Sequence, residues 1–377
     1  MVEIENLSLS YGNSPKVLKD ISLSINKGEC VLFTGKSGSG KSSIINSING
    51  LAMRYDGAST EGIIKIDNKD IRNLKLYEIS MLVSSVFQNP KTHFFNINTT
   101  LELLFYLENI GLSKKLMDER LNDMLELFPI NHLLNRDIFK LSGGEKQILC
   151  IAASYISGTE IIVLDEPSSN LDEENITIIK GMLTKLKDKG KTLIISEHRI
   201  FYLMDIIDRV FLIQDGKIKK AYTKTDFMKI SSEKLNELGL RNNTKTELIV
   251  PENQNKGSFQ IKNIEFQFNG ENNKLILKNI SFEMGKIYGI VGTNGLGKST
   301  LLKCLIGLER KSKDEIYLDG KKLSKTDRLK ISSLVMQDVN HQLFTDSVIS
   351  EVSLDIKNTE NSYVEDILRK QIGRAHV

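Results

Sequence analysis

The sequence predicts two successive α/β domains, each organised around a loop that binds phosphate. Two observations lead to this prediction: the pattern G-x-x-x-x-G-K-[ST] occurs twice, and each copy lies between a strand-like and a helix-like segment. In this pattern the glycines bring backbone N–H groups against phosphate oxygens, the lysine adds positive charge and the serine hydroxyl coordinates Mg²⁺. The first copy is Gly35, Lys36, Ser37, Gly38, Ser39, Gly40, Lys41 and Ser42, and the second is Gly292, Thr293, Asn294, Gly295, Leu296, Gly297, Lys298 and Ser299.

The segments around each loop supply the α/β context. Apolar runs at 30–34 and 287–291 are typical of buried strands, and apolar residues recur at helical spacing from Ser43 and from Thr300 onwards. A strand, a glycine loop and a helix N-terminus together form an anion site. We therefore expect a nucleotide at each loop, with Ser43 and Thr300 in the helical turn that contacts it.

Composition indicates an ordinary globular protein. The chain has 377 residues, enough for two domains; 40% are hydrophobic and 26% are charged. Its formal net charge of +3 is too small to suggest a nucleic-acid partner. No apolar run approaches membrane-span length and the N-terminus shows no signal peptide, so we expect synthesis for the cytosol. Cys30, Cys150 and Cys304 stand singly in apolar or helical stretches, which favours core thiols over metal ligands or disulfides.

A polar stretch separates the two copies of the loop. The pattern loosens between 223 and 258, and we interpret this stretch as a linker between a first domain at 1–222 and a second at 259–371. Within it, residues 231–240 are compatible with a short capped helix that ends at Gly239.

Leu141-Ser142-Gly143-Gly144-Glu145 predicts a second kind of anion site in the first domain. A serine and two glycines that open a helix leave N–H groups exposed at its positive end. The motif resembles the LSGGE signature of the ATP-binding cassette family. The resemblance implies a RecA-like core with an antiparallel β subdomain and a helical subdomain, here as two cassettes in tandem. In that family two cassettes pair head to tail, so Ser142, Gly143 and Gly144 would bind the ATP held by a partner's phosphate loop.

The helical subdomain has its own pattern. Leu121, Met124, Leu125 and Phe128 form an apolar stripe at helical spacing, which we interpret as core. The family often has arginine where the signature helix has Ile148, and we expect this change to weaken one surface contact but not the phosphate site.

A run of four apolar residues ends in Asp165 and Glu166, as expected of a buried parallel strand that presents acids at its C-terminal end. By the resemblance, Asp165 and the Ser42 hydroxyl would hold Mg²⁺, and Glu166 would orient or deprotonate the attacking water. His198 falls at the family's switch-histidine position, where it would contact the γ-phosphate. Gln88 matches the Q-loop glutamine, which touches Mg²⁺ and links the site to the helical subdomain.

The remaining predicted site residues bind adenine or belong to the second copy. Tyr11 would stack its ring on adenine, and Phe268 stands at the corresponding place before the second loop. In the second copy, Gln337 would take the Q-loop role and hold Mg²⁺ together with Ser299.

Short features indicate one group within the family. The segments 87–90 (FQNP), 94–95 (FF), 196–199 (SEHR) and 237–241 (ELGLR) resemble energy-coupling factor transporters, which are cassette importers for vitamins and transition-metal ions. The resemblance implies an ATPase that lies peripherally at the cytoplasmic face of the cell membrane. It would bind two ATP molecules and act on a transmembrane coupling protein, while a substrate-binding membrane component selects the cargo.

Two other functions stay open. One is the double-cassette ATPase of a conventional sugar-type importer, which the membrane partner would distinguish. The other is a soluble translation-factor-like cassette protein. That function would need a long, basic, helical arm between the cassettes, whereas the stretch 223–258 is short and mixes charges.

The second copy is expected to be incomplete. No second LSGGE motif, acidic strand end or switch histidine follows Gln337, so neither composite site could be completed within one polypeptide, and we expect two first cassettes from separate chains to pair. Residues 372–377 (IGRAHV) match what a common sequencing adapter encodes in one frame, which suggests a non-biological tail; a natural tail is the alternative.

Overall fold

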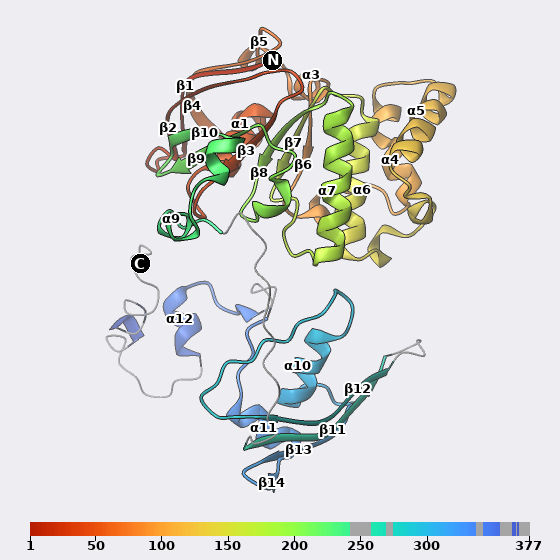
Figure 1. Ribbon diagram of the computed structural model, residues 1–377, viewed down its shortest axis with the longest axis vertical. Helices are drawn as coiled ribbons and strands as arrows, with labels where there is room; N and C mark the ends of the chain where they lie inside the picture. Colours follow the sequence, from red (N-terminus) through yellow and green to blue (C-terminus); the bar gives the residue numbers. More distant parts are fainter. Residues whose placement is uncertain (242–257, 269–273, 337–341, 355–363, 367, 369–377) are drawn as a thin grey trace. The chain divides into compact units, whose positions relative to one another are not determined.

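The computed structural model describes the chain except for residues 242–257, 269–273, 337–341, 355–363, 367 and 369–377. The chain forms two compact units, one mainly before and one mainly after the segment 242–257 (Figure 1). None of the helices within the described ranges combines the length and the apolar character needed to cross a membrane.

The first unit is built around a six-stranded sheet with the order β10-β9-β3-β8-β7-β6. All neighbouring strands from β9 to β6 run parallel, and β10 pairs with β9 antiparallel. The central strands β3 and β8 are buried along their whole length, which explains their continuous apolar sequences. The bounds are β3 Cys30–Thr34, β6 Val83–Val86, β7 Ile161–Asp165, β8 Thr192–Ser196, β9 Arg209–Gln214 and β10 Lys217–Thr223.

The two faces of this sheet have separate cores. Val31 and Phe33 of β3 pack in one core with Ile44 of the helix that follows the phosphate loop, whereas Cys30 and Leu32 belong to the other. Figure 1 shows the two long helices α6 and α7 side by side over this second face. The bounds are α1 Lys41–Ile48, α6 Gly143–Ile156 and α7 Glu173–Asp188.

An antiparallel sheet with the order β2-β1-β4-β5 adjoins α1, as the sequence predicted. Its inward-facing residues, among them Ile4 and Ile64, complete the core around α1. The bounds are β1 Val2–Tyr11, β2 Leu18–Ile25, β4 Ala58–Ile66 and β5 Lys69–Asp70, followed by a 3₁₀ turn at Ile71–Asn73; α2 is Leu51–Arg54 and α3 is Leu76–Ser80.

A helical part packs on the face of the six-stranded sheet that carries Cys30 and Leu32, as predicted. In α5, Met124 is fully buried and Phe128 at its end is 1% exposed, while Leu121 and Leu125 are partly buried against the same core. Ile148, which stands where the family often has arginine, is 5% exposed and lies in this core. The bounds are α4 Thr99–Asn109 and α5 Lys114–Leu127, with 3₁₀ turns at Pro90–Thr92, Asn131–Leu133, Ile138–Lys140 and Phe201–Leu203.

The three cysteines are core thiols. Cys30, Cys150 and Cys304 are buried and form no disulfide. Burial raises the pKa of the Cys30 thiol to about 12 and raises the pKa of Cys150 as well, so both stay protonated and unreactive at neutral pH.

Part of the predicted linker is packed on the first unit. It forms α8 Lys224–Met228 and α9 Ser232–Glu237, and the backbone turns at Gly239, where φ is 71°. Phe227, Leu235 and Leu240 are buried in the core that also contains α6 and α7. The rest of the predicted linker lies outside the described residues.

The second unit contains the antiparallel sheet β12-β11-β13-β14 and the helix after the second loop. Its buried core consists of Ile261, Ile264, Cys304 and Ile316. The bounds are β11 Phe259–Gln267, β12 Lys274–Phe282, β13 Lys313–Leu318, β14 Lys321–Lys322, α10 Lys298–Ile306, α11 Lys325–Ile331 and α12 Val348–Ser353.

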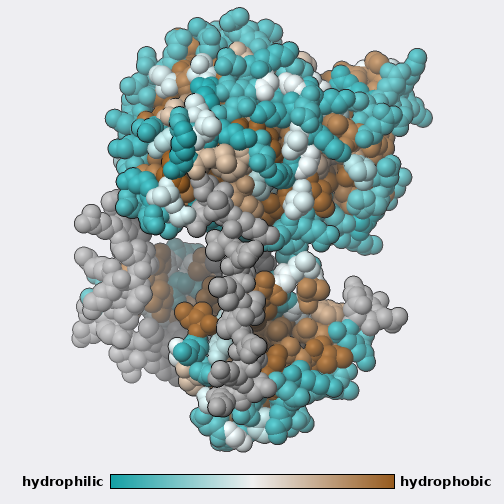
Figure 2. All heavy atoms as spheres, viewed as in Figure 1, coloured by the Kyte–Doolittle hydropathy of each residue, from teal (hydrophilic) through white to brown (hydrophobic). Residues whose placement is uncertain are grey.

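The strand predicted at 287–291 does not form. Ile287 is completely exposed and Val291 is 78% exposed, and Figure 2 shows hydrophobic side chains in brown on the visible surface of this unit. A buried parallel strand needs a hydrogen-bonded neighbour on each side. The described residues of the second unit provide no such neighbour for this run.

Candidate nucleotide site

The first phosphate loop connects β3 to α1, and its glycines are required by close packing. A Cβ atom at Gly35 would lie 2.2 Å from the Ile213 carbonyl oxygen, and one at Gly40 would lie 2.7 Å from Leu18 Cδ2. Gly40 also has φ 105°, in the left-handed region that favours glycine. The loop therefore lies flat against β9, and α1 begins with free N–H groups at its positive end.

Lys41 is the central cation of this loop. It is 4% exposed, and its ammonium donates to the carbonyl oxygens of Gly35 at 3.1 Å and of Lys36 at 3.0 Å. Burial lowers the pKa of Lys41, while the nearby carboxylates of Glu166 and Asp165 act in the opposite direction. The loop thus holds a desolvated cation in the ring of backbone groups where a phosphate oxygen would bind.

Asp165 ends β7 beside the loop. Its Oδ1 atom is buried without a hydrogen-bond partner, and burial raises its pKa, an effect that the Ser42 hydroxyl partly offsets. A buried, unpartnered carboxylate oxygen next to a hydroxyl fits Mg²⁺, which prefers oxygen ligands and usually takes one or two from the protein and the rest from phosphates and water. The described residues contain no cluster of three or more His, Cys, Asp or Glu side chains that could hold a metal.

Two of the predicted catalytic side chains contact the Glu166 carboxylate. Its Oε2 accepts from Gln88 Nε2 at 3.0 Å, and its Oε1 lies 3.1 Å from His198 Nε2. The hydrogen bond from His198 is the main reason why the pKa of Glu166 is lowered. The backbone of Glu166 has φ 45°, an uncommon value outside glycine, and its N–H donates to the Ser196 carbonyl at 2.8 Å. Three residues that are distant in sequence therefore meet at the carboxyl ends of β6, β7 and β8.

Tyr11 lies at the end of β1, next to the first turn of α1. Its hydroxyl lies 3.5 Å from Ser43 Oγ, and its ring is half-buried. This position leaves an aromatic ring beside the phosphate loop, as the prediction of adenine stacking requires.

The signature motif at the start of α6 is stabilised by local hydrogen bonds and one ion pair. Ser142 caps α6, and its hydroxyl accepts from the Glu145 N–H while Glu145 accepts from the Ser142 N–H and pairs with Arg136 at 2.7 Å. Gly143 is exposed with open space around it, whereas a Cβ at Gly144 would lie 2.2 Å from the Asn175 side chain. The helix therefore offers an exposed N-terminus.

The second phosphate loop repeats two features of the first: a lysine that donates to the first loop glycine and a helix that begins after a glycine with positive φ. Lys298 donates to the Gly292 carbonyl at 2.7 Å, and α10 begins after Gly297, whose φ is 87°. Phe268 packs beside the loop, since a Cβ at Gly297 would lie 3.3 Å from its ring. Gln337 lies outside the described residues.

The segment after α9 also reaches the first site, which sequence reasoning missed. A Cβ at Gly239 would lie 2.3 Å from Lys36 Cε, and a cavity of about 300 Å³ separates Glu237 and Leu238 from the phosphate loop. Arg241 contributes to the lowered pKa of Glu166. The spacing of leucines 235, 238 and 240 was the available signal, because it predicts burial against a neighbour.

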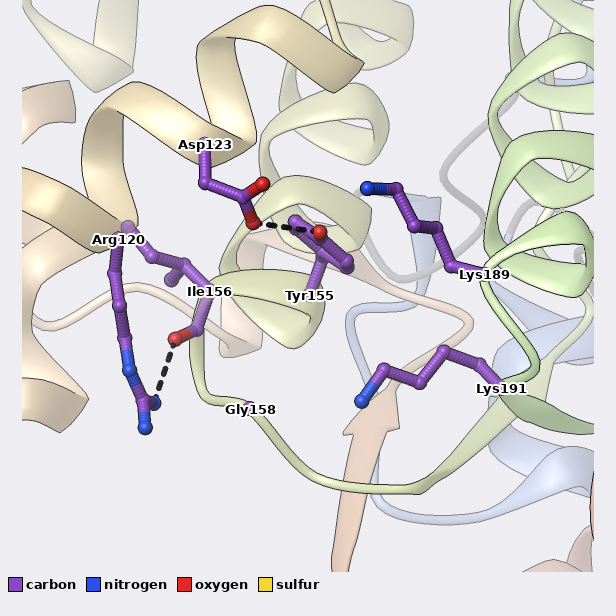
Figure 3. A pocket seen from close by; sticks show the side chains of 7 residues that line it. All are labelled: Arg120, Asp123, Tyr155, Ile156, Gly158, Lys189 and Lys191. Atoms are coloured by element: carbon purple, nitrogen blue, oxygen red, sulfur yellow. Dashed lines mark hydrogen bonds between the residues drawn. The ribbon is translucent and has the colours of Figure 1, made fainter.

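A larger cavity of about 340 Å³ lies at the opposite edge of the sheet, near the beginnings of β7 and β8 (Figure 3). Most of its polar lining groups have partners: Arg120 donates to carbonyls at the end of α6, Tyr155 donates to Asp123 at 2.7 Å, and Lys191 pairs with Glu160 at 2.9 Å. Parallel α/β sheets bind ligands at the carboxyl ends of their strands. We therefore assign these groups to helix capping and ion pairing.

The fold and the site define a class of protein: an ATPase with a phosphate loop between a parallel sheet and a helix, an adjoining antiparallel sheet, and a helical part that carries a second anion motif. The family model for the ABC transporter matches residues 18–169 and 277–374. The chain therefore belongs to the ABC transporter family. It is an ATP-binding and ATP-hydrolysing protein with the cassette fold.

The comparisons with individual proteins agree with this family. An ABC transporter ATP-binding protein of Treponema denticola is 39% identical over 380 residues, which cover 98% of this chain and 77% of the relative. The solved structure of cbiO1 from Clostridium perfringens, described as part of the ABC transporter complex cbiONQ, is similar with a TM-score of 0.55 and 25% identity. It covers 63% of this chain and 96% of cbiO1. The ATP-binding cassette MJ0796, solved as a dimer with ADP and phosphate, has a TM-score of 0.52 and 26% identity over 59% of this chain and 99% of its own.

Proposed function

We propose that this chain is the ATPase subunit of an energy-coupling factor importer, which powers uptake of a vitamin or a transition-metal ion through separate membrane subunits. The observation that carries the ATPase part is the meeting of Gln88 and His198 on the Glu166 carboxylate. The FQNP, SEHR and ELGLR segments support the importer type. The similarity to cbiO1, itself part of an ABC transporter complex, supports a role as one subunit among several.

In this proposal each side chain of the first site has one task. Lys41 binds phosphate oxygens, and Tyr11 stacks on adenine. Glu166, kept ionised by its lowered pKa, orients a water molecule and accepts its proton as the oxygen attacks the γ-phosphorus. His198 binds the γ-phosphate oxygens, and the bond to the β–γ bridging oxygen breaks to release ADP and phosphate.

Mg²⁺ fits the same site through Ser42, Asp165 and Gln88. When bound, it neutralises charge on the β- and γ-phosphates. The unpartnered Oδ1 of Asp165 is the structural support for this assignment. In the second copy, Ser299 and Gln337 are the proposed counterparts.

We further propose that the chain carries two cassette regions, at 1–222 and 259–371, with a second nucleotide on Gly292–Thr300 and Phe268. The matches of one family model to two separate ranges support this organisation. The exposed Ser142 and Gly143 would then bind the nucleotide of a partner cassette, which makes hydrolysis depend on pairing.

The membrane partner is proposed to dock beside the loop that follows Gln88. Three apolar side chains are exposed there: Phe95 at 77%, Ile97 at 65% and Phe139 at 76%. The buried side chain of Glu102, which is 5% exposed, fixes this loop by accepting from the Phe95 N–H at 3.0 Å. Because this loop begins at the glutamine that touches Glu166, a partner seated on it would sense the state of the nucleotide.

The first experiment measures ATP hydrolysis by the full chain against protein concentration. Hydrolysis that depends on pairing rises faster than linearly with concentration, whereas a linear rise would contradict the proposed composite site. Binding of MgATP by the Ser142→Ala variant is expected to be normal at low concentration, while its hydrolysis at high concentration is reduced.

The second experiment tests the membrane partner. The chain is expressed together with the membrane proteins encoded beside it, and co-purification from detergent is measured for Phe95→Glu combined with Phe139→Glu. This variant should lose the partner but keep its ATPase activity. Met228→Glu on α8, at a side chain that is 53% exposed, is the matched control and should keep both. Co-purification that survives in the double variant would contradict the proposed docking surface.

A further inference from the structure

Glu197 is a buried carboxylate to which neither the sequence pattern nor the roles proposed above give a function. It follows β8 and precedes His198, and it is 2% exposed. An ionised carboxylate in a protein interior is costly unless several donors satisfy it. The contacts of Glu197 therefore indicate what it is retained for.

Five donors converge on the Glu197 carboxylate. Oε1 accepts from the Ser168 N–H at 3.1 Å, from the Ser168 hydroxyl and from the Tyr202 hydroxyl at 3.1 Å. Oε2 accepts from the backbone N–H groups of His198 at 2.7 Å and Arg199 at 3.3 Å. Ser168 itself is fully buried. Oε1 thus holds the loop of Ser168, together with the Tyr202 hydroxyl, and Oε2 holds the backbone of His198 and Arg199.

These two loops carry the two residues that meet at the γ-phosphate position. Ser168 lies two residues after Glu166, and the Ser169 N–H donates to the Glu166 carbonyl at 3.0 Å. His198 begins the loop that Oε2 holds. The Glu166 N–H in turn donates to the Ser196 carbonyl, which closes the connection from the other side.

We propose that Glu197 is a positioning residue: by binding Ser168 with one oxygen and the backbone of His198 with the other, it fixes His198 against Glu166. The inference rests on the proposed role of His198 at the γ-phosphate. Glu197 acts through these groups and does not touch the nucleotide.

The geometry requires a carboxylate at this position. A glutamine has the same shape but only one acceptor oxygen, so its NH₂ group would face either the two N–H donors of the histidine loop or the donors of Ser168 and Tyr202. Tyr202 stays a donor because burial and the neighbouring Glu197 charge raise its pKa well above the ordinary value. The substitution Glu197→Gln therefore releases one loop while it changes the volume little.

The test compares Glu197→Gln, His198→Ala and Tyr202→Phe in the full chain. Two quantities are measured: kcat and KM for MgATP, and the ratio of the dissociation constants of MgADP and MgATP, the latter in a Glu166→Gln background that prevents turnover. Because a displacement of about 1 Å can cost about 100-fold in rate, we expect kcat of Glu197→Gln to fall by about tenfold to 100-fold. KM should change less than about twofold.

The preference for ATP over ADP should fall in Glu197→Gln as much as in His198→Ala, since both remove the contact with the γ-phosphate. Tyr202→Phe should keep kcat and this preference near those of the parent, because Glu197 then still has four donors. A Glu197→Gln variant that only melts at a lower temperature, with kcat and the preference unchanged, would overturn the inference.

Two other outcomes separate this inference from the proposed function. If His198→Ala loses the ATP preference and Glu197→Gln keeps it, the positioning role is wrong and the role of His198 stands. If both variants keep it, the role of His198 is wrong and the inference is overturned with it. Should Glu197→Gln not fold, Ser168→Ala removes only the hydroxyl donor: a several-fold lower kcat at unchanged KM supports the inference, and an unchanged kcat overturns it.

Discussion

Lys41 and Lys298 occupy the same place in two copies of one motif, yet their surroundings differ. Both donate to the carbonyl of the first loop glycine and both begin a helix after a glycine with positive φ. Lys41, however, is buried below the ends of three parallel strands that bring Asp165 and Glu166 next to it. Around Lys298, the described residues provide only an antiparallel sheet. The motif thus forms a phosphate cradle by itself, whereas the groups proposed for hydrolysis come from neighbouring strands.

The largest expected effect comes from Glu166, the carboxylate beside the first loop. Glu166→Gln should lower ATP hydrolysis by about 10²-fold or more while ATP stays bound, because the amide cannot accept the water's proton. Hydrolysis and equilibrium binding of ATP measure the two effects. Glu174→Gln, an exposed change at the start of α7, is the control and should leave both unchanged. Undiminished hydrolysis in Glu166→Gln would remove the assignment.

The second largest expected effect is a difference in ATP hydrolysis between variants of the two loop lysines. Lys41→Ala is expected to reduce hydrolysis by at least about tenfold, because a desolvated cation that contacts the phosphates is lost. Lys298→Ala should reduce the number of bound ATP molecules by one but leave the hydrolytic groups of the first site in place. Binding stoichiometry from titration calorimetry, together with the hydrolysis rate, distinguishes the loops. Equal loss of hydrolysis in both variants would show that the loops do not differ in this way.

The first glycines of the loops should differ in stability. Gly35→Ala is expected to destabilise the first unit by about 1–3 kcal/mol, because the new Cβ would lie 2.2 Å from the Ile213 carbonyl oxygen. At Gly292 the nearest atom is Leu296 Cδ1 at 3.1 Å, the end of a side chain that can move, so Gly292→Ala should cost much less. Calorimetric unfolding of both variants gives the comparison. A similar cost at both positions would contradict the close packing at Gly35.

The smallest expected effect is a gain in stability, whereas the glycine substitutions lower it. Burial raises the pKa of Asp165 above its unfolded value, so the folded state holds the proton to higher pH and stability falls as pH rises through that interval. Asp165→Asn should therefore stabilise the protein without nucleotide at pH 7, by on the order of 1 kcal/mol, and less at acid pH. Thermal melting against pH checks this, with Asp188→Asn as the exposed control. The variant should also lose its stabilisation by MgATP.

The meeting of the residues proposed for catalysis could be predicted because each lies directly after an apolar strand or within a distinctive motif. Asp165 and Glu166 end an apolar run, and parallel strands bring their ends together. The same reasoning failed at 287–291, since an apolar run becomes a buried strand only if partner strands exist. The burial of Ile148 could not be predicted either, because a family pattern gives the usual residue and not how its replacement packs here.

The network around Glu197 could not be predicted from the pattern at all. Its donors come from positions 168, 198, 199 and 202, so the contacts depend on how two loops fold against each other. A lone glutamate in a sequence is usually a surface residue. Its burial in the structure, together with its five donors, distinguishes it from the exposed glutamates.

The packing of α8 and α9 determines the shortest fragment of the chain that keeps the complete core of the first unit. A gene fragment that stops at position 222 would omit Phe227, Leu235 and Leu240, and so remove part of the core of the first unit, where α8 packs on β9 and β10. A chimaera that exchanges first cassettes between two relatives should therefore be joined after Arg241. The sequence predicted a linker at these helices, but they form part of the folded domain that they follow.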